Sequence, residues 1–167
     1  MSAVIYPGTF DPFTLGHLDI IERASRLFKE VIVAVVKSPS KLTLFSYEER
    51  VGMVRETLKD LKNVRVEGFE GLIVEFARRE GVRIILRGVR LVADFEYEFQ
   101  MALTNREISE EVETLFLMPN PKYFYISSRL IKEAAFLGAS VEKFLPPISW
   151  RMLKEKVNES KSRKDRK

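Results

Sequence analysis

The single histidine of this 167-residue chain, His17, closes the stretch Tyr6-Pro7-Gly8-Thr9-Phe10-Asp11-Pro12-Phe13-Thr14-Leu15-Gly16-His17. An apolar run precedes this stretch and an amphipathic helical pattern follows it, which predicts a strand, a glycine-containing loop and a Thr-x-Gly-His turn that opens a helix. The N–H groups and the dipole of a helix N-terminus favour bound anions, and an imidazole can donate a further hydrogen bond to phosphate. A single histidine at a helix start can also serve simply as a cap or surface residue.

The composition is that of an ordinary globular domain, with 46% apolar and 31% charged residues. The absence of cysteine excludes disulfides, thiolate catalysis and Cys-type zinc sites, and a single histidine excludes a His-rich metal site. The longest apolar run has six residues, whereas a membrane helix needs about 20. The first residues also lack the pattern of a signal peptide. We therefore expect a cytoplasmic protein with no membrane partner.

The net charge of +4 is concentrated at the C-terminus. Seven basic and three acidic residues lie between Lys154 and Lys167, so the rest of the chain carries equal numbers of each. We therefore expect no nucleic-acid partner, because an RNA-binding role would rest on this end alone. The composition predicts one domain at residues 1–158 and a basic, disordered tail at residues 159–167.

Strand and helix patterns alternate along the whole chain. Apolar segments predict buried strands at Ala3–Tyr6, Val31–Val36, Val64–Val66, Arg83–Gly88 and Leu115–Met118. Helices are predicted between them, with a capping box at Ser46 and Glu49, caps at Asp94 and at Ser127 or Ser128, and stops at Gly81 and Gly138. This order predicts a single-domain α/β fold with a doubly wound, five-stranded parallel sheet of the Rossmann-like type.

In such a sheet the ligand site lies at the carboxyl ends of the strands. The residues at or after the ends of the predicted strands are cations, hydroxyls, the imidazole and one phenylalanine: Thr9, Phe10, His17, Lys41, Arg87, Arg90, Ser127, Ser128 and Arg129. Together they suit several phosphate groups. Phosphoryl transfer needs two oriented anions and stabilised charge, without a nucleophile from the protein. The usual Gly-x-x-x-x-Gly-Lys-Ser/Thr loop is missing, so a nucleotide would have to bind at the Thr-x-Gly-His turn.

Five motifs occur in order along the chain: Y-P-G-T-F-D-P-F-T-L-G-H, S-P-S-K, R-G-V-R, D-F-E-Y-E and Y-I-S-S-R-L-I-K-E. Together they resemble the bacterial phosphopantetheine adenylyltransferases, a family of the nucleotidyltransferase superfamily, from about Val4 to Leu145. The first motif alone identifies only the superfamily. The chain departs from the family pattern at Leu15, where relatives often carry Asn, and at Arg129, where they carry a small hydroxyl residue.

The resemblance implies that an adenylyl group is transferred from ATP to 4′-phosphopantetheine, which gives dephospho-coenzyme A and pyrophosphate. The attack would be direct and in line, without a covalent enzyme intermediate. It also implies Mg²⁺, which would be carried with ATP because the sequence shows no carboxylate cluster to serve as a metal ligand set. A cytosolic homohexamer and feedback inhibition by coenzyme A are the further implications.

Residue roles follow from the same resemblance. It assigns His17 to catalysis as the stabiliser of the transition state, together with Lys41 and Arg90. The residues expected to bind phosphopantetheine are Thr9, Lys41, Ile73 and Arg87. The residues expected to bind ATP are Thr9, Phe10, His17, Gly88, Val89, Arg90, Glu98, Tyr123, Phe124, Tyr125, Ile126, Ser127, Ser128 and Arg129.

Two other readings of the same pocket stay open. One is a different nucleotidyltransferase, acting on nicotinate mononucleotide or transferring a cytidylyl group to an alcohol phosphate. The other is a protein that senses adenine nucleotides without catalysis, which would bind ATP without releasing pyrophosphate.

Overall fold

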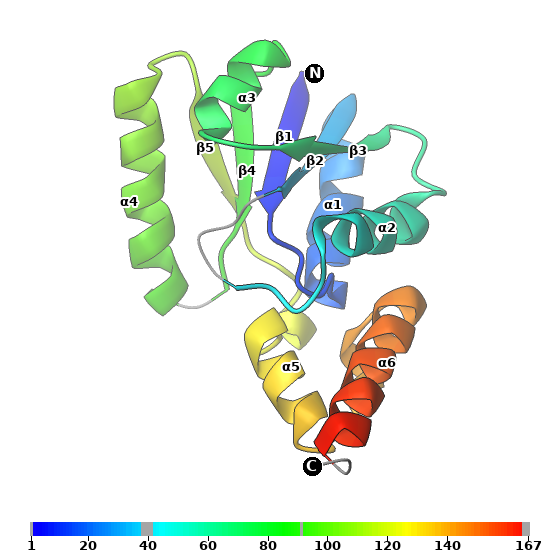
Figure 1. Cartoon of the computed structure of the whole chain (residues 1–167). Coiled ribbons are helices and arrows are strands. Elements are labelled where there is room, and N and C mark those ends of the chain that lie inside the picture. Colours follow the sequence, from blue (N-terminus) through cyan, green and yellow to red (C-terminus); the bar gives the residue numbers. More distant parts are fainter. Residues whose placement is uncertain (1, 38–41, 91, 165–167) are drawn as a thin grey trace.

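A computed structural model describes residues 2–37, 42–90 and 92–164, and these form a five-stranded parallel sheet with helices on both faces (Figure 1). The strands are β1 (Ala3–Gly8), β2 (Glu30–Val36), β3 (Val64–Phe69), β4 (Ile84–Gly88) and β5 (Glu113–Leu117). They lie in the order β3-β2-β1-β4-β5, and every neighbouring pair is parallel. The predicted fold class is confirmed.

The central strands are apolar because both faces of the sheet are covered. In β2 the side chains of Val31, Val33 and Val35 pack into one core, and those of Ile32 and Ala34 pack into the other. All five are fully buried. A strand of this kind cannot show the alternation of a half-exposed strand, which explains the continuous apolar run in the sequence.

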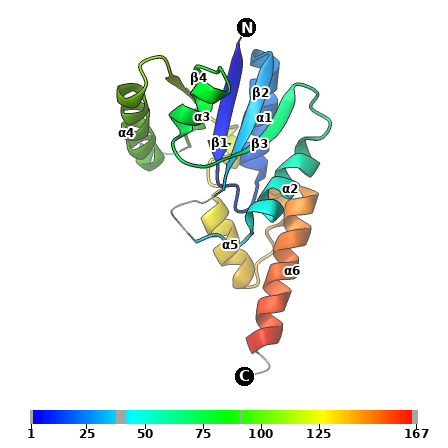
Figure 2. The ribbon, with the colours of Figure 1, turned by 45° about the horizontal axis from the view of Figure 1, so that its top comes forward.

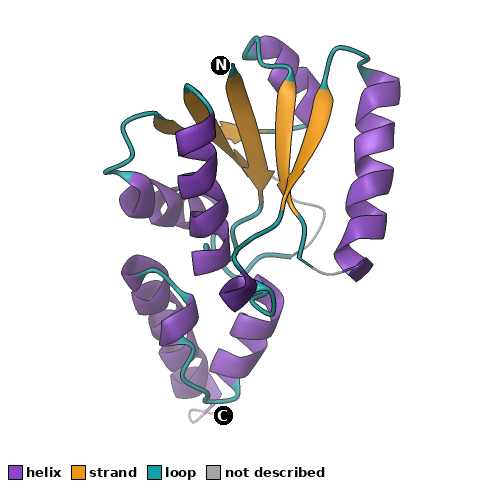
Figure 3. Cartoon of the chain, turned by 180° about the vertical axis from the view of Figure 1, so that it is seen from behind, coloured by secondary structure: helices purple, strands orange, loops and turns teal. Residues whose placement is uncertain are grey.

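Two helices cover each face of the sheet, as the view from behind also shows (Figure 3). Helices α1 (Leu15–Leu27) and α2 (Tyr47–Leu58) cover one face, and α3 (Ile73–Arg79) and α4 (Val92–Ile108) cover the other. The chain therefore leaves β1 toward one side of the sheet and β4 toward the opposite side. Since these strands are neighbours, a crevice is expected between their carboxyl ends.

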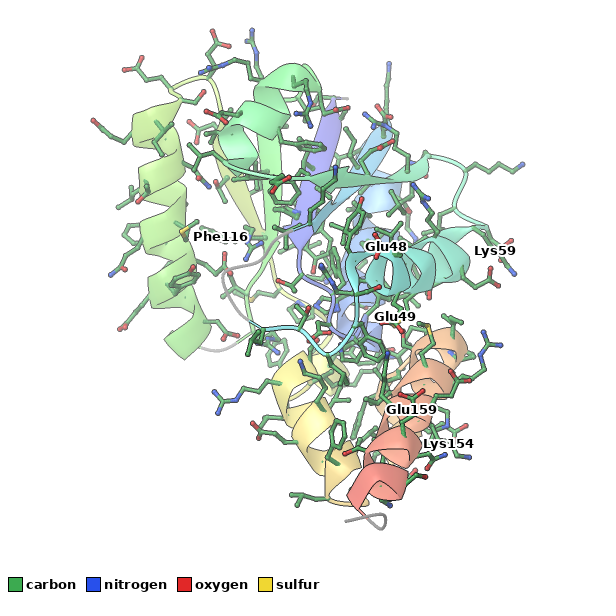
Figure 4. The ribbon with its side chains drawn as sticks, in the orientation of Figure 1. Glu48, Glu49, Lys59, Phe116, Lys154 and Glu159 are labelled. Carbon is green, nitrogen blue, oxygen red and sulfur yellow. The ribbon has the colours of Figure 1, made fainter. Side chains whose placement is uncertain are left out.

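The last two helices, α5 (Ser128–Phe136) and α6 (Pro147–Lys164), lie beyond the carboxyl ends of the strands (Figures 1 and 2). Short 3₁₀ turns precede them at Pro121–Tyr123 and Glu142–Phe144. An ion pair of 2.7 Å between Lys156 and Glu49 links α6 to α2, and Figure 4 shows Glu49 on the side of α2 that is nearest to α6. None of the helices in the described ranges combines the length and the apolar character that a bilayer crossing requires.

The predicted helix ends are mostly confirmed. Ser46 and Glu49 form a capping box, Ser127 caps α5, and Gly81 and Gly138 adopt positive φ angles of 67° and 93° just after α3 and α5. These angles are open to glycine because it lacks a Cβ.

Asp94 is not a cap, and this prediction was wrong. Helix α4 begins two residues earlier, at Val92, and the Asp94 carboxylate accepts a hydrogen bond of 3.0 Å from Arg90. The boundary predicted at residue 158 falls inside α6, which continues to Lys164. The Lys, Glu and Arg residues of this stretch favour helix, which explains why charge composition alone does not show that the helix continues past residue 158.

Candidate active site

A pocket of about 480 Å³ opens at the carboxyl ends of β1 and β4. It is lined by the loop after β1, the end of β4 and the N-terminus of α5. The predicted site residues in its lining are Thr9, Phe10, His17, Arg87, Gly88, Arg90, Glu98, Ile126, Ser127, Ser128 and Arg129. The rule that ligands bind at strand ends therefore gathers residues that lie far apart in the sequence into one cavity.

His17 lies in the first turn of α1, where its ring completes a capping box with Thr14. The Thr14 N–H donates to His17 Nδ1 at 3.0 Å, and the His17 N–H donates to Thr14 Oγ1 at 3.4 Å. Since a backbone N–H can only donate, Nδ1 is the acceptor, and the neutral ring carries its proton on Nε2. His17 can therefore cap the helix and also donate a hydrogen bond to a phosphate, because the capping contact at Nδ1 leaves the proton on Nε2.

Two phenyl rings hold the imidazole in place. The Phe10 ring meets the His17 ring edge-on with 5.1 Å between centroids, and the Phe13 ring lies 5.5 Å from it. Phe10 has a φ of 55°, a left-handed conformation that costs a residue with a side chain about 1–2 kcal/mol. Its ring folds over Gly8, where a Cβ would stand 2.6 Å from the ring. The glycine in this loop is therefore required by the aromatic side chain that follows it.

Arg50 of α2 lies behind this loop with 1% of its surface exposed. Its Nη1 donates to the carbonyl oxygens of Thr9 and Val36, both at 2.8 Å, and its Nη2 donates to that of Lys37 at 3.2 Å. Burial lowers the pKa of Arg50 from its ordinary value, and the Asp11 carboxylate opposes that shift. The guanidinium thus ties the end of β1 to the end of β2.

Arg87 and Glu98 form a two-point ion pair on the floor of the pocket. Arg87 donates to the two carboxylate oxygens of Glu98 at 2.6 Å each, and its Nη1 donates to the Pro7 carbonyl at 2.8 Å. Burial disfavours the charged guanidinium, but the hydrogen bonds and charge of Glu98 outweigh it, so the pKa of Arg87 is raised. The family resemblance assigns Arg87 to phosphopantetheine and Glu98 to ATP, whereas in the fold the two side chains pair with each other.

Arg90 bridges the two sides of the pocket entrance. Its Nε donates to Asp94 at 3.0 Å, and its Nη1 donates to the carbonyl oxygen of Ile126. The end of β4 is thereby held against the segment that leads into α5.

The N-terminus of α5 faces the loop after β1. Ser127 Oγ accepts the Leu130 N–H at 3.1 Å, which is an ordinary helix cap, and Ser128 Oγ donates to the Pro12 carbonyl at 2.8 Å. Arg129 pairs with Glu133 at 2.9 Å, and 86% of its side chain is exposed. Arg129, one of the two residues that depart from the family pattern, therefore lies at the solvent edge of the pocket.

A partly buried ion pair that was not expected from the sequence joins Asp11 to Lys132 of α5. The Asp11 carboxylate, 4% exposed, also accepts the N–H groups of Phe45 at 2.9 Å and of Leu44 at 3.1 Å. It therefore connects three segments of the chain around the pocket, and both members of the pair line it.

The sequence held a signal for each missed residue. Asp11 lies in the loop that follows β1, and Lys132 lies inside the motif Y-I-S-S-R-L-I-K-E. Arg50 precedes Val54 and Leu58 at four-residue spacing, so it stands on the buried stripe of its helix. A charge on an apolar stripe marks a residue with buried polar partners.

The remaining predicted residues lie elsewhere. Lys41 falls outside the described residues. Ile73 lines a second cavity of about 600 Å³, which shares Pro7, Gly8, Thr9, Arg87 and Glu98 with the first. Val89 is buried and donates its N–H to Leu117. Tyr123, Phe124 and Tyr125 belong to the 3₁₀ turn before α5 or follow it, outside the lining of the first cavity.

No group of three or more His, Cys, Asp or Glu side chains that could hold a metal ion is found among the residues that the structure describes. The polar side chains that line the pocket are mainly hydrogen-bond donors and cations. This donor set matches phosphate oxygens better than a divalent cation, which prefers oxygen ligands.

Comparison with known proteins identifies the family. Residues 5–134 match the family described as cytidylyltransferase-like. The phosphopantetheine adenylyltransferase of Ralstonia pickettii is 51% identical over 160 residues, which cover 96% of either chain. The chain belongs to the phosphopantetheine adenylyltransferase family. A second member of this family, from Caldanaerobacter subterraneus subsp. tengcongensis, is 49% identical over 96% of this chain and 100% of its own.

Solved structures confirm the fold. The nicotinic acid mononucleotide adenylyltransferase of Plasmodium falciparum, complexed with NaAD, superposes with a TM-score of 0.68 over 95% of each chain at 14% identity. At this identity the likeness extends to the architecture alone.

Proposed function

We propose that this protein transfers the adenylyl group of ATP to 4′-phosphopantetheine, giving dephospho-coenzyme A and pyrophosphate in the cytoplasm. The observation that carries the proposal is the identity of about 50% to phosphopantetheine adenylyltransferases along nearly the whole chain. An oxygen of the acceptor phosphate attacks the α-phosphorus of ATP, and the bond from that phosphorus to the β-phosphate bridging oxygen breaks. The electron pair leaves with pyrophosphate.

The cavity lined by His17 and the cavity lined by Ile73 fit this reaction because they adjoin each other, so two substrates bound in them would be neighbours. The nucleotide occupies the cavity that His17 lines, and the acceptor occupies the cavity that Ile73 lines. Thr9 and Arg87 belong to both linings. An attacking phosphate held there would stand beside the α-phosphate, which is the approach that in-line transfer requires.

His17 acts as a hydrogen-bond donor in this scheme. The Thr14 N–H occupies Nδ1, so Nε2 carries the proton that can be donated to an α-phosphate oxygen as charge grows in the transition state. Arg90 and Lys41 supply further positive charge. A general base is unnecessary because the acceptor phosphate is already ionised near neutral pH.

Mg²⁺ enters the proposal as a companion of ATP. Bound to the phosphate oxygens of the nucleotide, it would neutralise part of their charge, as it does in other phosphoryl-transfer sites. The protein would then hold the phosphates with N–H donors.

Feedback inhibition by coenzyme A also fits the proposal. Coenzyme A contains the pantetheine arm of the acceptor, so it would inhibit by occupying the same cavities.

We also propose that the protein is a homohexamer. An apolar surface on α4 and β5 supports self-association: it consists of Phe95, Phe99, Leu103, Phe116 and Met118, each at least 36% exposed. The rings of Phe95 and Phe99 stack, and Phe116 lies between α4 and the sheet in Figure 4. Contiguous exposed apolar surface of this kind marks association sites.

Pyrophosphate release tests the function directly. The purified protein is incubated with ATP, Mg²⁺ and one acceptor at a time: 4′-phosphopantetheine, nicotinate mononucleotide or glycerol 3-phosphate, with CTP in place of ATP as a further arm. Release with ATP and 4′-phosphopantetheine alone is expected. Release with nicotinate mononucleotide or with CTP would assign another nucleotidyltransferase activity, and ATP binding without release would identify a nucleotide sensor.

A further inference from the structure

The peptide group between Thr9 and Phe10 is held from behind by a buried cation. Arg50 donates to the Thr9 carbonyl oxygen at 2.8 Å, and the same guanidinium nitrogen donates to the Val36 carbonyl, also at 2.8 Å. Arg50 is almost fully buried and does not belong to the pocket lining, whereas Thr9 and Phe10 do. The carbonyl of this peptide therefore faces away from the pocket.

The orientation of the carbonyl fixes that of the N–H. The Thr9–Phe10 peptide bond is trans. In a planar trans peptide the C=O and the N–H point in opposite directions, so the Phe10 N–H points away from Arg50. Phe10 adopts a φ of 55°, which a residue with a side chain adopts only where its surroundings enforce it. The contacts of Arg50 and the strained φ of Phe10 together keep the Thr9–Phe10 peptide in one orientation.

We propose that Arg50 is a positioning residue for phosphate binding, which holds the Thr9 carbonyl so that the Phe10 N–H faces the pocket as a donor to a phosphate oxygen. This inference rests on the proposed function. Arginine suits the task because its planar fork reaches carbonyl oxygens of two strand ends in a fixed geometry, which the single ammonium group of lysine cannot reproduce.

The phosphate could belong to ATP or to 4′-phosphopantetheine, because Thr9 lines both cavities. The first experiment compares the Arg50→Lys variant with wild type by titration calorimetry, using ATP, 4′-phosphopantetheine and adenosine as separate probes. We expect the dissociation constant of at least one phosphorylated ligand to rise about 10-fold, as when one hydrogen bond to a charged group is lost. Adenosine binding is expected to stay within twofold.

Arg55→Lys is the matched control. Arg55 lies on the same helix and donates to a backbone carbonyl at 3.3 Å, but that carbonyl belongs to Val66 on β3 and not to the loop after β1. A purely structural Arg50 would weaken all three ligands together or none of them in a folded variant, and either result would overturn the inference. Wild-type pyrophosphate release is measured in parallel, so a failure of the proposed function is seen separately.

A second measurement needs no variant. Thr9-Phe10 is the only Thr-Phe pair in the sequence, so wild-type protein labelled with ¹³C-carbonyl threonine and ¹⁵N phenylalanine gives a single signal for this amide. We expect the signal to shift when ATP or 4′-phosphopantetheine is added and to stay in place with adenosine. An amide that ignores both phosphorylated ligands would refute the inference even if Arg50→Lys does not fold.

Discussion

The Glu98 carboxylate accepts two hydrogen bonds of 2.6 Å from Arg87 Nε and Nη2, and Arg87 Nη1 donates to the carbonyl oxygen of Pro7. The three residues come from α4, β4 and β1, so the guanidinium has a fixed place between the two central strands of the site. Glu98 is expected from the family resemblance to bind ATP, and in the structure its carboxylate pairs with an arginine that lines both cavities.

Glu98→Ala separates these two roles. If Glu98 orients Arg87 for the acceptor, we expect the KM for 4′-phosphopantetheine to rise about 10-fold, the scale of one lost charge-assisted hydrogen bond, with a smaller change in the KM for ATP. Steady-state kinetics with each substrate varied in turn provides the measurement. Glu133→Ala, which breaks the exposed pair with Arg129, serves as the control. A rise confined to the KM for ATP would instead support the expected role of Glu98 in ATP binding.

His17→Ala tests the donor role at the α-phosphate. We expect kcat to fall about 100-fold or more with little change in ATP affinity, because a donor that acts in the transition state contributes little to ground-state binding. Calorimetry and pyrophosphate release on the same preparation give both quantities.

The His17 substitution also removes half of a capping box, so it needs a control. Thr14→Ala removes the cap oxygen but keeps the imidazole, and we expect it to cost about 1 kcal/mol of stability. If Thr14→Ala lowers kcat as much as His17→Ala does, the histidine acts only through the helix end.

Asp11 and Lys132 are expected to be coupled. Breaking a buried pair by removing one partner leaves an unpaired charge, and because Lys132 is partly exposed we expect Asp11→Asn or Lys132→Met alone to cost about 2 kcal/mol. The double substitution should cost clearly less than the two single values added together. Urea unfolding of the four proteins gives the coupling, and strict additivity would mean that the two side chains act independently.

Tyr6 predicts a specific alkaline instability. Burial raises the pKa of Tyr6 to about 12, with the neighbouring Arg87 acting in the opposite direction. Between pH 10 and pH 12 the unfolded chain loses this proton before the folded one does, so the folded state loses stability over that range by about 2–3 kcal/mol. Tyr6→Phe should lose less stability than wild type there, and the exposed Tyr125→Phe should behave like wild type. Equal pH profiles for all three proteins would contradict this assignment.

If the apolar surface on α4 and β5 forms the subunit contact, a charge introduced there should weaken the oligomer. Phe99→Glu is expected to reduce the oligomer seen by light scattering after size-exclusion chromatography, because an unpaired carboxylate is costly in an apolar interface. Leu137→Glu, at an exposed position on the end of α5, is the control. A hexamer that persists in Phe99→Glu would place the subunit contacts elsewhere.

The sequence predicted the sheet well because apolar runs and turn residues are local signals. Val31–Val36 lies inside β2, and Ser46 caps α2 as its spacing with Glu49 indicates. The strand-end rule then gathered His17, Arg87 and Ser128 without any distance information. Contacts between side chains far apart in the sequence could not be predicted in this way. The pairing of Arg87 with Glu98 depends on how α4 lies on the sheet, and composition cannot indicate that. The carbonyl partners of Arg50, on Thr9 and Val36, likewise appear only once β1 and β2 are side by side.

The bond from Ser128 Oγ to the Pro12 carbonyl spans 116 positions of the chain, and it has a consequence for biosynthesis. A nascent chain that has emerged from the ribosome as far as β4 already contains His17, Arg87 and strands β1 to β4. The pocket that we propose for the nucleotide still lacks one wall until α5 has been made. A truncated product that ends before residue 128 would keep most of the sheet, yet we expect it to leave ATP unbound.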